Sequence, residues 1–309
     1  MCIRDRAYNH SPWNRAGYFV EKYFTPLGHK VFNISLDKTP YWSNWNQNLP
    51  VYLPKGFPVS VQSLEKKLKV RFDCVIELDG TGQFHLSGMK SSNIPTLLWS
   101  MDTHVRAKNL FQVYFQKDFS LILTCHKDYV GNFLKTRCEW LPVAADPDLH
   151  RPMKIPKIYD IAFVGNLNPQ GYPNRVRYLE ALSKKYRVGA FSNLFGDEMV
   201  TVLNQGKLVF NKSFNGDLNL RVFEALSMGA CLLTDRVQNG LLDLFKDGKH
   251  LITYGDLPEL EEKAAYYLSH DQERESIAQA GRAQVLAHHT YYTRAKEIMK
   301  FIENLEENK

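Results

Sequence analysis

The chain has 309 residues, of which 44% are apolar and 23% are charged, and its formal net charge at pH 7 is +6. A chain of this length can form about two domains with buried cores, and this composition excludes a mostly disordered, collagen-like or low-complexity protein. No apolar run reaches the roughly 18 residues that a membrane-spanning helix needs, which leaves peripheral contact with a membrane open. The positive charge is spread along the chain, so it suits an anionic ligand or a membrane surface and argues only weakly for nucleic acid.

Five cysteines occur without the C-x-x-C spacing of a zinc or redox site. Cys74, Cys125 and Cys231 lie inside apolar runs, so we expect buried thiols in a reducing compartment rather than disulfides or zinc ligands. The N-terminus lacks the apolar h-region of a secretory signal, and a cytoplasmic location follows by default.

Strands and helices alternate through the first half of the sequence. Apolar periodicity predicts the strands 30–36, 73–78, 95–101, 120–125 and 139–143 and the helices 14–27, 61–68, 108–116 and 127–135. A long loop rich in Trp, Asn and Pro is expected over 39–58. Residues 1–12 are too charged for the buried strand that normally opens a Rossmann-like domain, so either that strand is missing or the domain begins on its first helix.

A proline-rich stretch without periodicity, 144–157, separates this half from the next. After it, the predicted strands are 160–165, 187–191, 207–211, 230–234 and 250–253, and the predicted helices are 174–185, 197–204, 219–228, 241–245, 257–268, 272–288 and 291–305. Short apolar strands that alternate with amphipathic helices predict an α/β fold, with parallel sheets covered on both faces.

Two such sets predict two Rossmann-like domains. We expect an N-terminal domain over 1–145, a linker over 146–157 and a C-terminal domain over 158–290. The last segment, 291–309, is expected to be a helix that braces the N-terminal domain.

The common nucleotide and hydrolase motifs are absent. The sequence has no P-loop, no G-x-G-x-x-G, no H-E-x-x-H and no G-x-S-x-G. Asp146 and Asp148 form a D-x-D sequence, but it lies in the proline-rich stretch, so we expect a plain turn. His150 follows Asp146 by four residues in a segment without the helical pattern that would put both on one face. No metal site is therefore expected.

The strongest local signal spans residues 211–235, N-K-S-F-N-G-D-L-N-L-R-V-F-E-A-L-S-M-G-A-C-L-L-T-D. A strand ends at Asn211, a polar loop with a glycine follows, and a helix opens near Asn219, where free backbone amides form an anion site. Arg221 in the first turn opposes the helix dipole, which indicates a ligand or a buried carboxylate partner. One turn further, Glu224 is placed to accept two ribose hydroxyls; the alternative is an ion pair with Arg221 on a solvated face.

These residues carry a resemblance. R-V-F-E-A-L-S-M-G-A-C-L-L-T-D, L-F-K-D-G-K-H-L-I-T-Y and A-G-R-A-Q-V-L-A-H-H-T-Y-Y-T-R-A are similar to the C-terminal domain of the group 1 glycosyl transferases, in particular the CgeB-like (spore maturation protein) branch. A looser similarity covers 99–104, 140–147 and 159–166. The resemblance implies the GT-B architecture, in which two Rossmann-like domains with parallel sheets face each other across a cleft. It further implies a nucleotide-diphosphate sugar as co-substrate, held mainly by the C-terminal domain, with no cofactor and no obligatory metal.

The resemblance also assigns residues in the C-terminal half. Glu224 matches the ribose-binding glutamate, and the backbone near Asn219 and Leu220 matches the start of the diphosphate-binding helix. Gly165 and Asn166 match the loop that approaches the phosphates or the acceptor.

Cations near this loop are candidates for the pyrophosphate. Arg175 and Lys212 are placed to reach it. For Arg175, an ordinary position on the surface is an equal alternative. Without a metal, these cations and Arg221 would stabilise the charge on the departing diphosphate.

One position departs from the family pattern. Many group 1 enzymes carry E-x7-E, with the first glutamate near the sugar hydroxyls, but Gly216 stands eight residues before Glu224. Asp217 is the nearest carboxylate and would have to substitute one residue out of register.

In the N-terminal half, the predicted strand 95–101 leads into Asp102 and His104. We expect both near the anomeric carbon or the acceptor, since a histidine can bind a sugar hydroxyl or transfer a proton near neutral pH. The alternative for His104 is a strand-end histidine satisfied by a backbone carbonyl. Asp79 and Gly80 end the neighbouring strand and are weaker candidates for the acceptor side.

The function expected from these residues and the resemblance is a metal-independent glycosyltransferase of hexosyl type, retaining by analogy. Its acceptor is a saccharide, a protein or a lipid-linked molecule. The main alternative is a non-catalytic nucleotide-sugar-binding or scaffold module with the same fold, which the missing first glutamate favours. A periplasmic-type binding protein lacks its signal peptide here, and a nucleic-acid binder lacks any recognised module.

Overall fold

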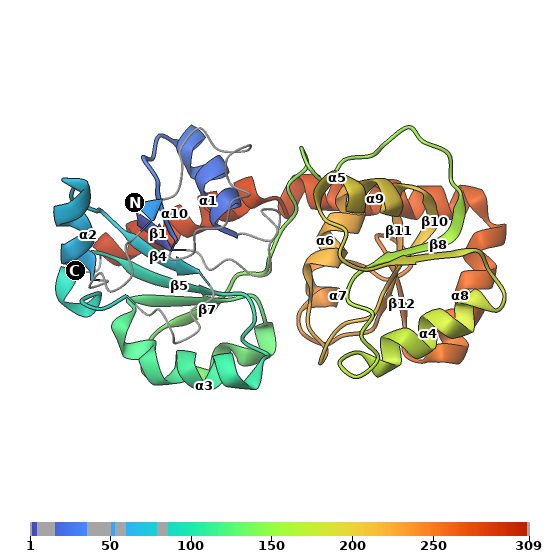
Figure 1. The fold of residues 1–309 in the computed structure, drawn as a ribbon, viewed down its shortest axis with the longest axis horizontal. Coiled ribbons are helices and arrows are strands. Elements are labelled where there is room, and N and C mark those ends of the chain that lie inside the picture. Colours follow the sequence, from blue (N-terminus) through green and yellow to red (C-terminus); the bar gives the residue numbers. More distant parts are fainter. Residues whose placement is uncertain (1, 5–15, 36–50, 53–59, 79–85, 308–309) are drawn as a thin grey trace. The chain divides into compact units, whose positions relative to one another are not determined.

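The computed structural model describes residues 2–4, 16–35, 51–52, 60–78 and 86–307. The chain divides into two compact units, residues 1–142 with 291–309 and residues 143–290. Both are α/β units built on a parallel sheet, as the alternation of strands and helices predicts (Figure 1). Residues 146–157, expected as a linker, belong to the second unit.

In the described residues of the first unit, seven strands form one parallel sheet in the order β3-β2-β1-β4-β5-β6-β7. The strands are β1 (Cys2–Arg4), β2 (Phe32–Ser35), β3 (Val51–Tyr52), β4 (Val75–Leu78), β5 (Thr96–Ser100), β6 (Leu121–Thr124) and β7 (Cys138–Trp140). The order reverses between β1 and β4, as in doubly wound Rossmann sheets. The segments after these two strands, with Asp79 and Gly80, lie outside the described residues.

Two of these strands correct the sequence analysis. Cys2–Arg4 form β1, which pairs in parallel with both β2 and β4, although the segment seemed too charged for a central strand. Val51–Tyr52 form the edge strand β3 inside the predicted long loop. Both strands are short, with three and two residues. They therefore leave no apolar run that periodicity can detect.

Helices of the first unit are α1 (Ala16–Phe24), η2 (Thr25–Leu27), α2 (Val61–Leu68), η4 (Lys90–Ser92), α3 (Arg106–Phe115), η5 (Gln116–Asp118), η6 (Lys127–Asn132) and α10 (Tyr291–Glu307). The predicted α-helix 127–135 is wrong: η6 is a 3-10 helix, in which Phe133 donates to the carbonyl of Val130 three residues back. The last helix, α10, packs on α1, where Phe19 and Tyr291 stack with ring centroids 4.3 Å apart.

The start of α2 yields a first prediction. Ser60 accepts a hydrogen bond from the Ser63 amide (3.1 Å), and the Ser63 hydroxyl accepts one from the Ser60 amide (2.9 Å), which forms a capping box. Ser60→Ala is expected to lower the free energy of unfolding of this unit by about 1 kcal/mol, because the Ser63 amide at the start of the helix loses its hydrogen-bond acceptor. Differential scanning calorimetry measures the shift. The exposed Ser91→Ala is the control, and an equal shift in both variants would contradict the capping role.

The second unit contains a parallel sheet in the order β12-β11-β10-β8-β9. Its elements are β8 (Tyr159–Val164), α4 (Pro173–Ser183), β9 (Val188–Phe191), α5 (Gly196–Asn204), β10 (Gly206–Asn211), α6 (Leu220–Ser227), β11 (Cys231–Asp235), α7 (Leu241–Leu244), β12 (Ile252–Tyr254), α8 (Leu257–Ser269) and α9 (Asp271–His288). Helices α5 and α6 pack on one face of the sheet, and α4 and α8 pack on the other (Figure 1). The core between sheet and helices includes Phe163, Phe210 and Tyr254.

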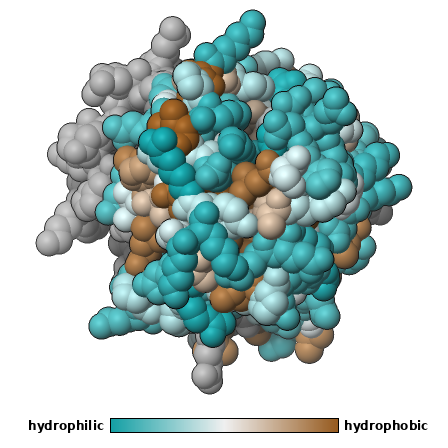
Figure 2. Space-filling view, turned by 90° about the vertical axis from the view of Figure 1, so that its right-hand side faces the viewer, coloured by the Kyte–Doolittle hydropathy of each residue, from teal (hydrophilic) through white to brown (hydrophobic). Residues whose placement is uncertain are grey.

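The buried thiols are where the apolar runs predict them. Cys74, Cys125 and Cys231 are free and buried, and burial raises the pKa of Cys231 to about 12. Most of the surface of the second unit in Figure 2 is hydrophilic, with hydrophobic residues in separate patches. No helix in the described part of the chain is both long and apolar enough to cross a membrane.

Candidate functional site

The strand order of the second unit reverses at β8. The chain leaves β8 toward β9 on one side and later reaches β10 on the other side. At such a point, the loops after the two central strands diverge to opposite faces and leave room for a ligand at the carboxyl ends. Gly165 and Asn166 follow β8, and Lys212 and Asp217 follow β10. The sheet therefore brings these predicted residues to one edge.

Arg175 joins the two diverging loops. Its Nη1 donates to the carbonyl oxygen of Asn166 (3.0 Å) and its Nη2 donates to that of Lys212 (2.8 Å). The guanidinium stacks on the Tyr172 ring at 4.2 Å, and burial lowers its pKa. Arg175 thus connects the loops after β8 and β10. Neither sequence-based interpretation, a pyrophosphate-binding residue or a surface arginine, included this role.

Lys212 is held by a carboxylate that sequence analysis did not assign to the site. Its Nζ lies 2.7 Å from Oδ2 of Asp235, the last residue of β11. The other oxygen of Asp235 accepts a hydrogen bond from the Ser213 amide (2.8 Å). The sequence contains a signal for this contact, because Asp235 is an acidic residue at the end of an apolar strand. Neighbouring parallel strands end at the same edge of a sheet, so a carboxylate at the end of β11 lies near the end of β10.

The loop after Lys212 is a tight turn. Asn215 and Gly216 have positive φ angles of 53° and 72°, and Oδ1 of Asp217 accepts a hydrogen bond from the Phe214 amide (2.5 Å). Asp217 is buried, so this hydrogen bond directs its carboxylate toward the backbone of its own loop.

Helix α6 begins after this turn without a side-chain cap. Asn219 is its N-cap residue, but the Asn219 amide group points to Oδ1 of Asn211 (3.4 Å), and its own Oδ1 is buried without a hydrogen-bond partner. The first turn, which starts at Leu220, contains no acidic residue. The first amides of such a helix carry partial positive charge and suit an anion.

Arg221 and Glu224 form an ion pair, with 2.9 Å between Nη1 and Oε2. The alternative considered for Glu224 placed this pair on a solvated face, but the side chains are only 14% and 13% exposed. Nη2 of Arg221 also donates to the carbonyl oxygen of Val164 at the end of β8 (2.9 Å). The pair therefore lies at the point where the strand order reverses.

His150 lies beside the same glutamate, with Nε2 3.5 Å from Oε1 of Glu224. The sequence predicts a plain turn at Asp146 and Asp148 but has no helical pattern that would put Asp146 and His150 on one face. A backbone hydrogen bond from His150 to the carbonyl of Asp146 (2.7 Å) closes one turn there. A single turn is too short to produce a periodic signal.

In the first unit, Asp102 and His104 follow β5 as predicted. Nδ1 of His104 lies 2.8 Å from Nε2 of His126, which lies 2.8 Å from the carbonyl oxygen of Met101. A carbonyl only accepts, so Nε2 of His126 carries the hydrogen, and the neutral His104 ring then carries its hydrogen on Nε2. Burial, with His104 nearby, lowers the pKa of His126 to about 4.

This pKa predicts a pH dependence of stability. Between pH 4 and 6.5 an unfolded His126 binds a proton that the folded one does not, so the free energy of unfolding falls as pH falls through this window, by at most about 3 kcal/mol. His126→Gln, which keeps a donor, should have a shallower slope. Urea unfolding at pH 7 and pH 5 measures both slopes, and equal slopes would contradict the prediction.

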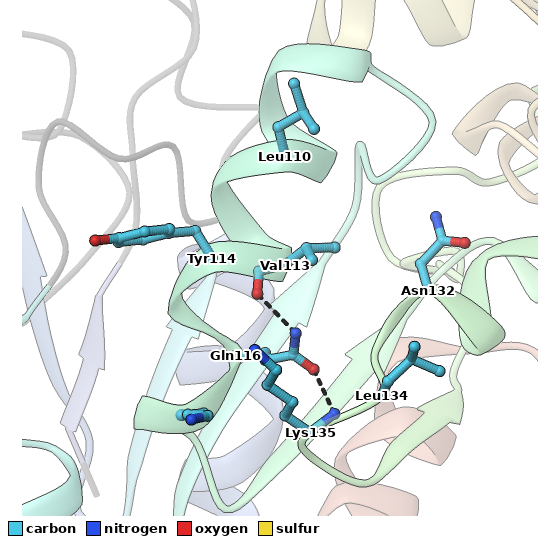
Figure 3. A pocket seen from close by; sticks show the side chains of 8 residues that line it. Leu110, Val113, Tyr114, Gln116, Asn132, Leu134 and Lys135 are labelled. Atoms are coloured by element: carbon cyan, nitrogen blue, oxygen red, sulfur yellow. Dashed lines mark hydrogen bonds between the residues drawn. The ribbon is translucent and has the colours of Figure 1, made fainter.

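A pocket of about 470 Å³ lies in the first unit between α3 and residues 132–135 (Figure 3). Leu110, Val113 and Leu134 line it together with Lys117 and Lys135. The buried Gln116 also lines it, and its side-chain amide donates to the Val113 carbonyl and accepts from the Lys135 backbone amide (both 2.7 Å). The lining includes none of the predicted site residues. Among the described residues, no three His, Cys, Asp or Glu side chains form a group that could hold a metal ion.

Solved structures define the class of fold. The chain is similar to HepE (Alr3699) from Anabaena, solved with UDP and glucose, at TM-score 0.74 and 14% identity over 98% of this chain and 100% of that chain. A glycosyltransferase from Rickettsia africae ESF-5 has TM-score 0.71 and 12% identity over 100% and 98%. Sucrose-phosphate synthase (tll1590) from Thermosynechococcus elongatus has TM-score 0.67 and 10% identity over 100% of both chains. The chain thus has the GT-B fold of glycosyltransferases, which confirms the predicted fold class.

The family follows from the sequence. Residues 147–300 match the model of a family described as glycosyl transferase-like, and this part of the chain, about half of its length, belongs to that family. The match includes Glu224, Arg221 and the loop before them. No curated protein matches the chain.

Proposed function

We propose that this protein is a glycosyltransferase that moves a hexosyl group from a nucleotide-diphosphate sugar to an acceptor without an obligatory metal ion. The mostly buried Arg221–Glu224 pair at the start of α6 carries the proposal, since it places a cation and a carboxylate beside uncapped helix amides. The family match over these residues supports it, as does the similarity to HepE, solved with UDP-glucose. The motif at 221–235 further favours the CgeB-like branch.

The diphosphate would lie at the start of α6. The amides of the first turn and the partial charge of the helix attract it, and Arg221 adds a full positive charge. Negative charge grows on the diphosphate as the sugar bond breaks, so these donors stabilise the transition state more than the bound donor. Lys212, whose side chain is 22% exposed, is the second cation assigned to this group, and Gly165 with Asn166 would border it.

Glu224 would accept the ribose hydroxyls. A carboxylate has about four lone-pair directions, and contacts with Arg221 and His150 occupy only part of them. Its position one turn into α6 suits a ribose whose diphosphate lies at the helix start.

The proposal assigns Asp102 and His104 to the reacting sugar or the acceptor. The Nε2–H tautomer makes His104 a hydrogen-bond donor through that nitrogen, which suits a hydroxyl or an anionic oxygen. Retention of anomeric configuration is adopted by analogy with the group 1 enzymes.

A non-catalytic nucleotide-sugar-binding module is the second candidate. Gly216 stands where many relatives in this group have the first glutamate, and Asp217 directs its carboxylate into its own turn. Both observations leave the donor sugar without an obvious acidic partner on this loop.

Binding and turnover separate the two candidates. We expect one of UDP, GDP and ADP to bind in calorimetric titration, and the matching sugar donor to be hydrolysed or transferred. Saturable binding without turnover across a donor panel would favour the module, and no binding of any nucleotide would contradict both.

A further inference from the structure

His150 is a buried residue outside every sequence-predicted site. It is 3% exposed and contacts Glu224, which lies 74 positions later in the chain (224 − 150). A buried histidine usually needs hydrogen-bond partners at both ring nitrogens. The hydrogen-bond partners of this ring determine whether the nitrogen near Glu224 carries a hydrogen.

The backbone amide of Asp146 lies 3.2 Å from Nδ1 of His150. An amide nitrogen only donates, so Nδ1 must accept, and the neutral ring carries its hydrogen on Nε2. This assignment rests on the hydrogen-bond partners. The nitrogen that lies 3.5 Å from Oε1 of Glu224 therefore carries the hydrogen, and the carboxylate is flanked by Arg221 at one oxygen and by His150 at the other.

The backbone around His150 is fixed from both neighbouring helices. Its carbonyl oxygen accepts a hydrogen bond from the hydroxyl of Ser227, the last residue of α6 (2.7 Å). The carbonyl of Arg151 accepts one from the side-chain amide of Asn204, at the end of α5 (3.2 Å). A ring on so constrained a backbone can hold a neighbouring side chain in one orientation.

We propose that His150 is a positioning residue for ribose recognition: it orients the Glu224 carboxylate so that the free lone pairs of that group face the two ribose hydroxyls of the nucleotide. This inference rests on the proposed function of Glu224. A single contact, from Arg221 to one oxygen, restrains the carboxylate less than contacts at both oxygens do. The second contact, from His150, narrows the range of orientations of the carboxylate, so less ordering is required when the ribose binds.

The chain contains a matched control for this role. His250 also accepts the backbone amide of a residue four positions earlier, Lys246, at 3.2 Å, and its own amide donates to the Lys246 carbonyl (2.9 Å). It is buried in the same unit, but its contacts do not include Glu224. His250→Leu therefore repeats the loss of a turn-bound histidine without the loss of a donor to the carboxylate.

The test measures ribose discrimination by calorimetry. The probes are the tightest-binding of UDP, GDP and ADP and its 2′,3′-dideoxy analogue, titrated into wild type, His150→Leu, His150→Gln and His250→Leu. We expect the wild type to prefer the ribose form about 100-fold and His150→Leu only about 10-fold, with affinity for the dideoxy form unchanged. His150→Gln, which keeps a donor, should recover most of the preference, and His250→Leu should match the wild type.

Other outcomes overturn the inference in distinguishable ways. Equal weakening of both ligands in His150→Leu means that the histidine only supports the fold. A preference that His150→Leu retains removes the positioning role but leaves the proposed function standing. A wild type that binds no nucleotide removes both. Independently of any ligand, long-range ¹H–¹⁵N NMR should show the Nε2–H tautomer for His150, and an Nδ1–H tautomer would overturn the inference.

Discussion

Arg221→Met is expected to lower kcat about 1000-fold at saturating donor, which corresponds to about 4 kcal/mol of barrier. The variant loses the cation nearest the start of α6, where charge grows on the departing diphosphate. It also leaves Glu224, which is 13% exposed, without its ion-pair partner, and the loss of one member of a mostly buried pair is costly. Initial rates of transfer or donor hydrolysis measure the effect, and nucleotide affinity should fall much less than kcat.

Arg177→Met is the matched control, because Arg177 is exposed on α4, the helix that also carries Arg175. A surface arginine of this kind contributes little, so its variant should keep the wild-type rate. Arg221→Lys keeps the charge but not the two-pronged geometry that reaches both Val164 and Glu224, and an intermediate rate is expected. Wild-type kcat in Arg221→Met would remove the cation from the proposed mechanism.

Positive and negative side chains are equal in number in the group near the end of β8, where the strand order of the second unit reverses. The group consists of the cations Arg175, Lys212 and Arg221 and the carboxylates Asp217, Glu224 and Asp235. Because each cation already has a partner, the uncapped amides of α6 add an attraction for a diphosphate beyond that of Arg221 and Lys212. The balanced cluster also holds the site in shape before the ligand arrives, which reduces the ordering that binding requires.

Among the described residues, periodicity in the sequence predicted each α-helix and each strand except β1 and β3, but it missed the 3-10 helix η4 and gave η6 as a longer helix. The loop between Asn211 and α6 was also predicted, because a strand end, a glycine and a helix start are local features. The short strands at Cys2–Arg4 and Val51–Tyr52 were missed because two or three residues carry no period. A turn at Asp146 was predicted, but the hydrogen bond that brings His150 back to Asp146 was not.

Contacts that depend on packing were beyond sequence analysis. Asp235 reaches Lys212 only because β11 lies next to β10, and His150 reaches Glu224 because Ser227 and Asn204 hold its segment against α6 and α5. These partners lie tens of residues apart in the chain, and no spacing rule connects them. The residues that touch a ligand were thus easier to predict than the residues that hold them in place.

Glu224→Ala is expected to weaken binding of the ribose nucleotide about 100-fold, or about 3 kcal/mol, because two charge-assisted hydrogen bonds to the ribose are lost. Binding of the 2′,3′-dideoxy nucleotide should change little, since it makes neither bond. Glu180→Ala, an exposed glutamate on α4, is the control and should bind as the wild type does. Unlike a loss of overall fold, this effect is selective for the ribose. If Glu224→Ala binds both nucleotides with wild-type affinity, the glutamate serves only as the structural partner of Arg221, and the ribose site must lie elsewhere.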